Sequence, residues 1–184
     1  SAASDVYKRQ VFIHVTTDGR DTAPNASASY ISLLKDKCPK DVVFASIIGR
    51  YFSMDRDKRW ERTQIAYDLI KDGTASYYAE TAEQAIRDAY DRKETDEFIT
   101  STVLADYKGM RSRDGILMTN FRVDRARQIM SAFFIPDETE LISKADIKPA
   151  AGLAITPLSD RLNEVVSHLF APADLRNGLG ETIS

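Results

Sequence analysis

The feature that most constrains the fold is an apolar pattern in residues 11–48 that predicts a strand, a helix and a second strand. Val11–Thr16 is apolar and β-branched, and it stops at the turn residues Asp18 and Gly19. The helix between the strands has apolar residues on one face, at Ala28, Ile31, Leu34 and Cys38. Val42–Ile48 is a continuous apolar run, as in a strand buried on both faces. This spacing predicts a βαβ unit with a parallel pair of strands.

The rest of the chain continues the alternation of helices and strands. One amphipathic helix ends at Gly73, and another begins at Thr81, where Gln84 completes a capping-box pattern. The remaining expected elements are two strands with a hairpin-like connection, a helix and a last strand, at Phe98–Leu104, Gly115–Phe121, 120–134 and Gly152–Pro157. We therefore expect a single α/β domain of three layers, α/β/α, with a mixed, largely parallel sheet.

The composition argues against several classes of function. Hydrophobic residues make up 43% and charged residues 29% of 184 positions, which is near the average for soluble globular proteins. No apolar run approaches the roughly 20 residues that cross a bilayer, and no secretory leader opens the chain. The net charge of -3 argues against generic nucleic-acid binding. The one cysteine, Cys38, fits a reducing cytoplasm, and with only two distant histidines a zinc site is not expected.

Arginine and aspartate concentrate in three segments that adjoin predicted strands, namely Asp18–Asp21, Gly49–Arg62 and Arg122–Arg125. Ligands of open α/β sheets bind beyond the carboxyl ends of the strands, so we expect the segments to meet at one edge. Guanidinium groups held together there repel one another unless an anion or carboxylates neutralise them. The arginine fork suits phosphate and carboxylate oxygens, and interleaved aspartates can accept from hydroxyls. The pattern predicts a pocket for a small, doubly anionic, hydroxylated metabolite.

A less specific interpretation of the same residues stays open. Arginine and aspartate mixed in loops are usually solvated surface ion pairs that contribute little. Tyr51 and Trp60 are expected to be packing residues rather than base-stacking platforms. We expect His14, inside a strand, to be a satisfied buried histidine, and His168 to be structural or solvent-facing.

The three segments also carry a resemblance to a known family. Residues 14–24 resemble the His-x-x-x-Asp-Gly-Arg-Asp-x-x-Pro element of the cofactor-independent phosphoglycerate mutases. Gly49–Arg62 is similar, almost letter for letter, to their Gly-Arg-Tyr-x-x-Met-Asp-Arg-Asp-x-Arg-Trp-Glu-Arg signature. Asn120–Gln128 resembles their Asn-Phe-Arg-x-Asp-Arg-x-Arg-Gln element, and Leu179–Ser184 resembles the segment that returns to the catalytic domain. The matches run in family order from Val11 onward.

The resemblance implies an isomerase that interconverts 2- and 3-phosphoglycerate in glycolysis and gluconeogenesis through a phosphoserine intermediate. It also implies two divalent metal ions, usually manganese, no 2,3-bisphosphoglycerate cofactor, and a monomeric, cytoplasmic protein without nucleic-acid or membrane partners. An inserted domain of such enzymes grips the substrate. The substrate-binding positions that carry over from the family motifs are Arg20, Asp21, Arg50, Arg56, Arg122 and Arg125.

The sequence also departs from the family pattern. The serine nucleophile, the metal ligands and a Gly-Val-His-Ser-His stretch do not occur in it, so the resemblance implies a fragment that is inactive alone and binds no metal. We expect a non-native or disordered leader at residues 1–10. Residues 11–176 are expected to form the substrate-binding domain, incomplete on its N-terminal side, and residues 177–184 to start the linker to the catalytic domain.

Two other functions remain as alternatives. The first is a standalone anion-binding module for phosphorylated metabolites. The second is a nucleic-acid binder built on the arginine-rich segment with Tyr51, Phe52 and Trp60. The negative net charge and the carboxylates between the arginines disfavour the second.

Overall fold

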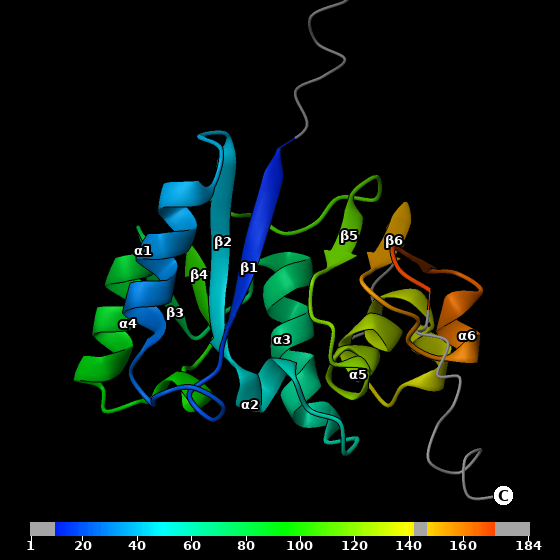
Figure 1. Ribbon diagram of the computed structural model, residues 1–184, viewed down its shortest axis with the longest axis horizontal. Helices are drawn as coiled ribbons and strands as arrows, with labels where there is room; N and C mark the ends of the chain where they lie inside the picture. Colours follow the sequence, from blue (N-terminus) through cyan, green and yellow to red (C-terminus); the bar gives the residue numbers. More distant parts are fainter. Residues whose placement is uncertain (1–9, 142–146, 172–184) are drawn as a thin grey trace, which may run out of the picture.

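Two β-sheets organise the part of the chain that the computed structural model describes, residues 10–141 and 147–171 (Figure 1). The first sheet has the strand order β1 (Val11–Thr17), β2 (Val42–Gly49), β4 (Thr102–Leu104) and β3 (Tyr77–Ala79). Its β1–β2 and β3–β4 pairs are parallel, whereas β2 and β4 are antiparallel. The second sheet is parallel throughout, in the order β5 (Gly115–Met118), β6 (Ala151–Ala154) and β7 (Ser167–His168).

Helices cover both faces of the first sheet (Figure 1). The α-helices are α1 (Ser27–Lys37), α2 (Arg50–Ser53), α3 (Trp60–Asp72), α4 (Ala82–Asp91), α5 (Val123–Phe134) and α6 (Asp160–Asn163). Two short 3-10 helices are η1 (Asp96–Phe98) and η2 (Pro136–Glu138). Helices α1 and α4 lie on one face of the sheet, and α3 lies on the other face, where it packs against α5.

The core is divided by β2. Because successive residues of a strand point to opposite faces, Ile47 packs with α1 and α4 while Ile48 packs with α3 and α5. The apolar cluster that contains Ile48, α3 and α5 continues to Leu158 and Leu162, so α5 lies between α3 and the second sheet. A ring of Phe134 occupies the space beside Gly152, where a Cβ would meet it at 2.6 Å.

The expected fold class is confirmed, with mixed, largely parallel strands between helices. The expected helix signals also hold. Gly73 ends α3 in the left-handed conformation with φ of 68°, and the Thr81 hydroxyl accepts from the Gln84 N–H at the start of α4.

Two expectations about the sheet are wrong. The structure contains two sheets rather than one, and β4 and β5 do not form a hairpin, because they belong to different sheets. Both edges of β4 are already paired, with β2 and β3, so no edge is free for β5. Strand β4 also begins at Thr102 rather than Phe98, since Asp96–Phe98 turns as η1.

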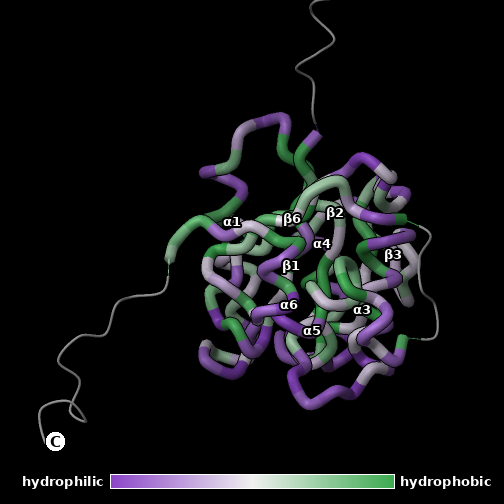
Figure 2. Tube along the Cα trace, turned by 90° about the vertical axis from the view of Figure 1, so that its right-hand side faces the viewer, coloured by the Kyte–Doolittle hydropathy of each residue, from purple (hydrophilic) through white to green (hydrophobic). Residues whose placement is uncertain are grey.

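Short elements without a periodic pattern were not expected from the sequence. These are α2, α6, β3, β7 and the two 3-10 helices η1 and η2. The proposed linker 177–184 and all but the last residue of the proposed leader 1–10 lie outside the described residues. In Figure 2, the loops at the lower end of the molecule are coloured as hydrophilic. This is the end at which α3 and α5 begin in Figure 1.

Candidate functional site

The carboxyl ends of β1, β2 and β5 point to one end of the molecule (Figure 1). Strand β1 leads into the loop at Asp18–Asp21, β2 leads into α2, and β5 leads into α5, whose N-cap residue is Arg122. Helices α1, α3 and α5 begin at the same end, so the positive ends of their dipoles face it. This arrangement favours anions there.

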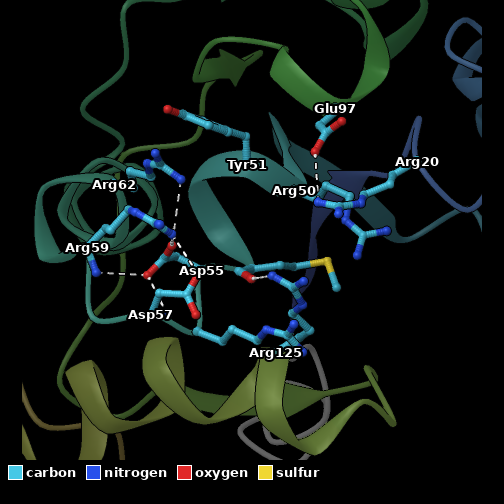
Figure 3. Close-up of a pocket in the computed structure, with 11 residues that line it drawn as sticks. Arg20, Arg50, Tyr51, Asp55, Asp57, Arg59, Arg62, Glu97 and Arg125 are labelled. Atoms are coloured by element: carbon cyan, nitrogen blue, oxygen red, sulfur yellow. Dashed lines mark hydrogen bonds and ion pairs between the residues drawn. The ribbon is translucent and has the colours of Figure 1, made fainter.

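A polar cavity of about 170 Å³ opens at this end (Figure 3). Six arginines line it together with three acidic residues, Tyr51 and Met54. The arginines are Arg20, Arg50, Arg56, Arg59, Arg62 and Arg125, and the acidic residues are Asp55, Asp57 and Glu97. Positive charge therefore exceeds negative charge on its wall, although the whole chain is acidic.

Arg50 is the buried arginine of this set, with 5% of its surface exposed. Its Nη1 donates to Asp18 Oδ1, and to Asp21 Oδ2 at 2.8 Å. Asp18 Oδ1 also accepts from the backbone N–H groups of Arg20 and Asp21 at 3.3 and 3.2 Å. Partial burial alone raises the pKa of Asp18, but these hydrogen bonds and the charge of Arg50 bring the net shift below the ordinary value. Hydrogen bonds within the loop after β1 and to Arg50 therefore fix the conformation of this loop.

The same loop reaches α5 through a second arginine. Arg122 Nη1 donates to Asp21 Oδ2 at 2.6 Å, so one carboxylate serves two guanidinium groups. The hydrogen bond from Arg50 is the largest cause of the lowered pKa of Asp21. Nearby, Arg56 Nη1 donates to Asp124 Oδ2 at 2.6 Å, and both of these side chains are about half exposed. An exposed pair of this kind contributes little to stability and exchanges readily.

Among residues 10–141 and 147–171, no carboxylate forms such a pair with Arg125. Its Nη1 donates to the backbone oxygen of Met54 at 2.9 Å, and its buried Nε has no hydrogen-bond partner among the described residues. Burial, followed by the charges of Arg56 and Arg50, lowers the pKa of Arg125. A buried donor surrounded by like charges is where an added anion gains most.

The loop between α2 and α3 is fixed by a buried carboxylate that the sequence did not single out for this role. Asp55 Oδ2 accepts from the backbone N–H groups of Asp57 and Arg59, at 3.1 and 2.9 Å, and from Gln128 Nε2 at 3.0 Å. Gln128 Oε1 in turn accepts from the N–H of Lys58, whose φ is 59°. These bonds tie the loop that carries Arg56 to α5.

Tyr51 forms one wall of the cavity and also packs against neighbouring rings. The guanidinium of Arg62 lies 3.7 Å from the centre of its ring, and Phe52 and Phe98 each lie 5.1 Å away, centroid to centroid. The packing role expected for Tyr51 is therefore confirmed, and its place in the cavity was missed. Trp60, the first residue of α3, is partly buried and packs against the core.

The structure brings the three arginine segments together, as the sequence predicted. Four of the six expected positions, Arg20, Arg50, Arg56 and Arg125, line the cavity. The other two, Asp21 and Arg122, lie beside it, where the Asp21 carboxylate accepts from both Arg122 and Arg50. Sequence reasoning missed Arg59, Arg62 and Glu97, although Arg59 and Arg62 lie inside the long signature that was singled out. Glu97 had no signal, because it comes from the turn before β4.

The two histidines lie where they were expected. His14 Nδ1 is 2.8 Å from Ser46 Oγ, and burial lowers the pKa of His14 to about 4. His168 lies exposed in β7. In the part of the chain that the structure describes, no group of three or more His, Cys, Asp or Glu side chains could hold a metal ion. No helix in that part is long and apolar enough to cross a bilayer.

Comparisons with known proteins agree on one family. The family model described as BPG-independent PGAM N-terminus matches residues 1–157. A protein of Gluconobacter oxydans (strain 621H), named 2,3-bisphosphoglycerate-independent phosphoglycerate mutase, is 40% identical over 174 residues, which is 95% of this chain and 34% of that protein. A protein of the same name from Pseudomonas putida (strain GB-1) is 40% identical over 177 residues, with the same coverage. The chain spans about a third of the length of these curated relatives.

A solved structure gives the same result. The chain is similar to Leishmania mexicana phosphoglycerate mutase, whose crystal structures were determined at low cobalt concentration, with a TM-score of 0.73 and 26% identity. The similarity covers 96% of this chain and 34% of that one. The fold, the arginine cavity and the matched family model lead to one conclusion: this chain belongs to the family of 2,3-bisphosphoglycerate-independent phosphoglycerate mutases.

Proposed function

We propose that this chain is the substrate-binding part of a phosphoglycerate mutase that interconverts 2- and 3-phosphoglycerate in glycolysis and gluconeogenesis. The observation that carries the proposal is the cavity at the carboxyl end of β2, where six arginines face three carboxylates. Phosphoglycerate carries a phosphate, a carboxylate and a hydroxyl, which are the groups that arginine forks and an aspartate acceptor recognise.

The proposed roles follow from the state of each side chain. Arg125 binds an anionic oxygen without first giving up an ion pair, because its buried Nε has no partner among the described residues. Arg56 exchanges its exposed partner Asp124 for the ligand at little cost. Arg50 stays clamped, and it keeps Asp21 oriented to accept from a glycerate hydroxyl.

The remaining two proposed positions frame this group. Arg20 lies 3.7 Å from Glu97, a loose exposed contact, so its guanidinium is free to reorient toward the ligand. Arg122 binds Asp21 and closes the site from the side of α5. Together the arginines hold the glycerate while a phosphoryl group is transferred elsewhere.

The phosphoryl transfer itself is assigned to the rest of the protein. The described residues do not fit a metal site, since the carboxylates at the cavity are engaged by arginines and no other cluster has the required donors. We propose that two divalent metal ions, manganese by expectation, and a serine nucleophile lie on a second domain. No 2,3-bisphosphoglycerate is required under this proposal.

We assign residues 11–176 to the substrate-binding domain, with the linker to the second domain beginning at residue 177. We further propose that the full-length protein is a cytoplasmic monomer. The curated relatives are about three times as long as this chain, so their length accommodates a further domain beside a part of this size.

Calorimetric titration of the chain with 3-phosphoglycerate tests the binding role. We expect saturable binding by the wild-type chain, loss of binding in an Arg50→Ala, Arg56→Ala double variant, and no conversion to 2-phosphoglycerate by the chain alone. Turnover by the purified chain that disappears when one of its own residues is mutated would contradict the proposal. Equal affinity for many phosphorylated metabolites would favour the standalone anion-binding module instead.

A further inference from the structure

A buried aspartate outside the cavity holds the loop between β1 and α1, residues 18–26, which contains Asp18 and Asp21. Asp96 lies at the start of η1, and its surface is 0% exposed. Its Oδ2 accepts from the backbone N–H groups of Ala26 and Ser27 at 2.8 and 2.9 Å. Its Oδ1 accepts from the hydroxyl of Tyr90 at 2.6 Å. Both oxygens are thus used, and none of these bonds reaches the cavity.

The backbone of the same residue binds both ends of the loop. The N–H of Asp96 donates to the oxygen of Pro24 at 2.8 Å, and the hydroxyl of Thr17 donates to the oxygen of Asp96 at 2.6 Å. Helix α1 has Ala26 at its N-cap and no acidic residue in its first turn. Asp96 therefore supplies the missing cap from 70 positions further along the chain.

The next residue makes the contact with the site. Glu97 Oε1 lies 3.7 Å from Arg20 Nη1. Its backbone also fills the space beside Gly19 and Gly49, where an added Cβ would lie 2.6 Å from the nitrogen and 2.3 Å from the oxygen of Glu97. These glycines directly precede Arg20 and Arg50, so the turn at residues 96–97 sets where both arginines emerge.

We propose that Asp96 is a positioning residue for the phosphoglycerate site. By capping α1 and binding both ends of the loop, it places Asp18 and Asp21 where they clamp Arg50. The inference rests on the proposed function, because it concerns the same cavity and the same class of ligand, a small phosphorylated hydroxy acid.

Three variants of the chain test this role by titration with 3-phosphoglycerate. Asp96→Ala removes the cap, and we expect affinity to fall roughly tenfold or more, since displaced binding groups lose much of their effect. Asp96→Asn keeps an oxygen for the Ala26 and Ser27 N–H groups, and its amide donates to Tyr90, so we expect affinity near wild type. Thr81→Ala removes the cap of α4, whose N-terminus lies at the opposite end of the first sheet, and should lower stability without changing affinity.

The outcomes separate positioning from general stabilisation. A folded Asp96→Ala chain with wild-type affinity, or a Thr81→Ala chain that loses as much affinity, would overturn the proposal. If Asp96→Ala does not fold, Thr17→Val replaces it, because that change removes one tie to Asp96 and leaves the cap in place. We then expect affinity to fall several-fold, and wild-type affinity would overturn the proposal.

A wild-type chain that binds no 3-phosphoglycerate would count against the proposed function, and a ligand-free readout then decides the role of Asp96. The guanidinium N–H signals of Arg50 in nuclear magnetic resonance spectra should be protected from exchange in the wild type and in Asp96→Asn. They should lose protection in Asp96→Ala, or partly in Thr17→Val. Equal protection in all of these chains would overturn the positioning role.

Discussion

Arg125 is held in place against the repulsion of its neighbours. Burial, followed by the charges of Arg56 and Arg50, lowers its pKa, and its Nε finds no partner among the described residues. A positive group whose pKa is lowered by folding destabilises the folded chain when charged. Under the proposed function, the anion bound by Arg125 would offset this cost.

Replacing Arg125 should separate affinity from stability. We expect Arg125→Met to weaken 3-phosphoglycerate binding by about 1.5–3 kcal/mol, the usual effect of a lost hydrogen bond to a charged group. The free energy of unfolding should stay the same or rise, because one of several like charges is removed. Calorimetry and urea denaturation measure the two quantities.

Arg127→Met is the matched control on the same helix. Arg127 Nε donates to the backbone oxygen of Leu158, away from the cavity. Its loss should leave the affinity for 3-phosphoglycerate unchanged. If both variants bind alike, Arg125 has no special place in the site.

His14 gives the fold a dependence on acid. Its pKa is about 4 in the folded chain against 6.5 for an unperturbed histidine, so the unfolded chain takes up the proton first. Stability is then fully present above pH 6.5 and is lost as pH falls toward 4, by up to about 3 kcal/mol. The free energy of unfolding, measured by urea denaturation at several pH values in this range, should fall less steeply with decreasing pH in His14→Gln. Glutamine keeps an acceptor for Ser46 but does not titrate. An equal slope in both chains would assign the loss to other groups.

At the scale of elements, β2 and η1 approach so closely that only glycine fits between them. A Cβ on Gly49 would lie 2.3 Å from the backbone oxygen of Glu97 and 2.7 Å from the nitrogen of Ile99. Neither group can move alone, because Gly49 N–H also donates to the Ile99 oxygen at 2.8 Å. The contact sets the distance between the end of β2 and the turn that carries Glu97.

We expect Gly49→Ala to cost about 1–3 kcal/mol of stability through overpacking. It should also reduce the affinity for 3-phosphoglycerate, because Arg50 follows directly. Gly115→Ala, in exposed β5, meets its nearest atom at 3.3 Å and should cost less than about 1 kcal/mol with no change in affinity. Thermal denaturation and titration of both variants check this, and similar losses in the two would refute the close-approach argument.

How much of this could be predicted depends on how local the signals are. The strands at Val11 and Val42, the cap at Thr81 and the end at Gly73 have signals within a few residues, and all were predicted. The meeting of the three arginine segments at one edge was predicted from the rule that ligands of open α/β sheets bind beyond the carboxyl ends of the strands. The family motifs then supplied the individual positions.

The rest depends on partners far apart in the sequence. Asp55 accepts from Gln128, which lies 73 positions away in the sequence, and Asp96 caps α1 from 70 positions away. No local sequence pattern predicts either contact. The split into two sheets was missed for the same reason, since only the pairing of β4 with β2 and β3 excludes β5. Sequence periodicity identifies strands but does not select their partners.

For the whole molecule, ligand binding and folding are linked. At a 3-phosphoglycerate concentration about 100 times its dissociation constant, the free energy of unfolding should rise by about 2.7 kcal/mol. Because the cavity is open to solvent, about 0.5 M salt should reduce this gain by screening. Urea denaturation with and without ligand measures both effects. A gain of the same size in the Arg50→Ala, Arg56→Ala variant would place the ligand elsewhere.

The ion pair between Asp21 and Arg122 joins positions 101 residues apart. Closing a contact of such long range carries a large entropic cost, and the pair can form only when both segments are available. Under the proposed function, the site is complete during synthesis only after the segment around Arg125 has left the ribosome and α5 has docked. The metabolite would then slow unfolding and leave the folding rate unchanged, and it would lengthen the lifetime of the folded chain.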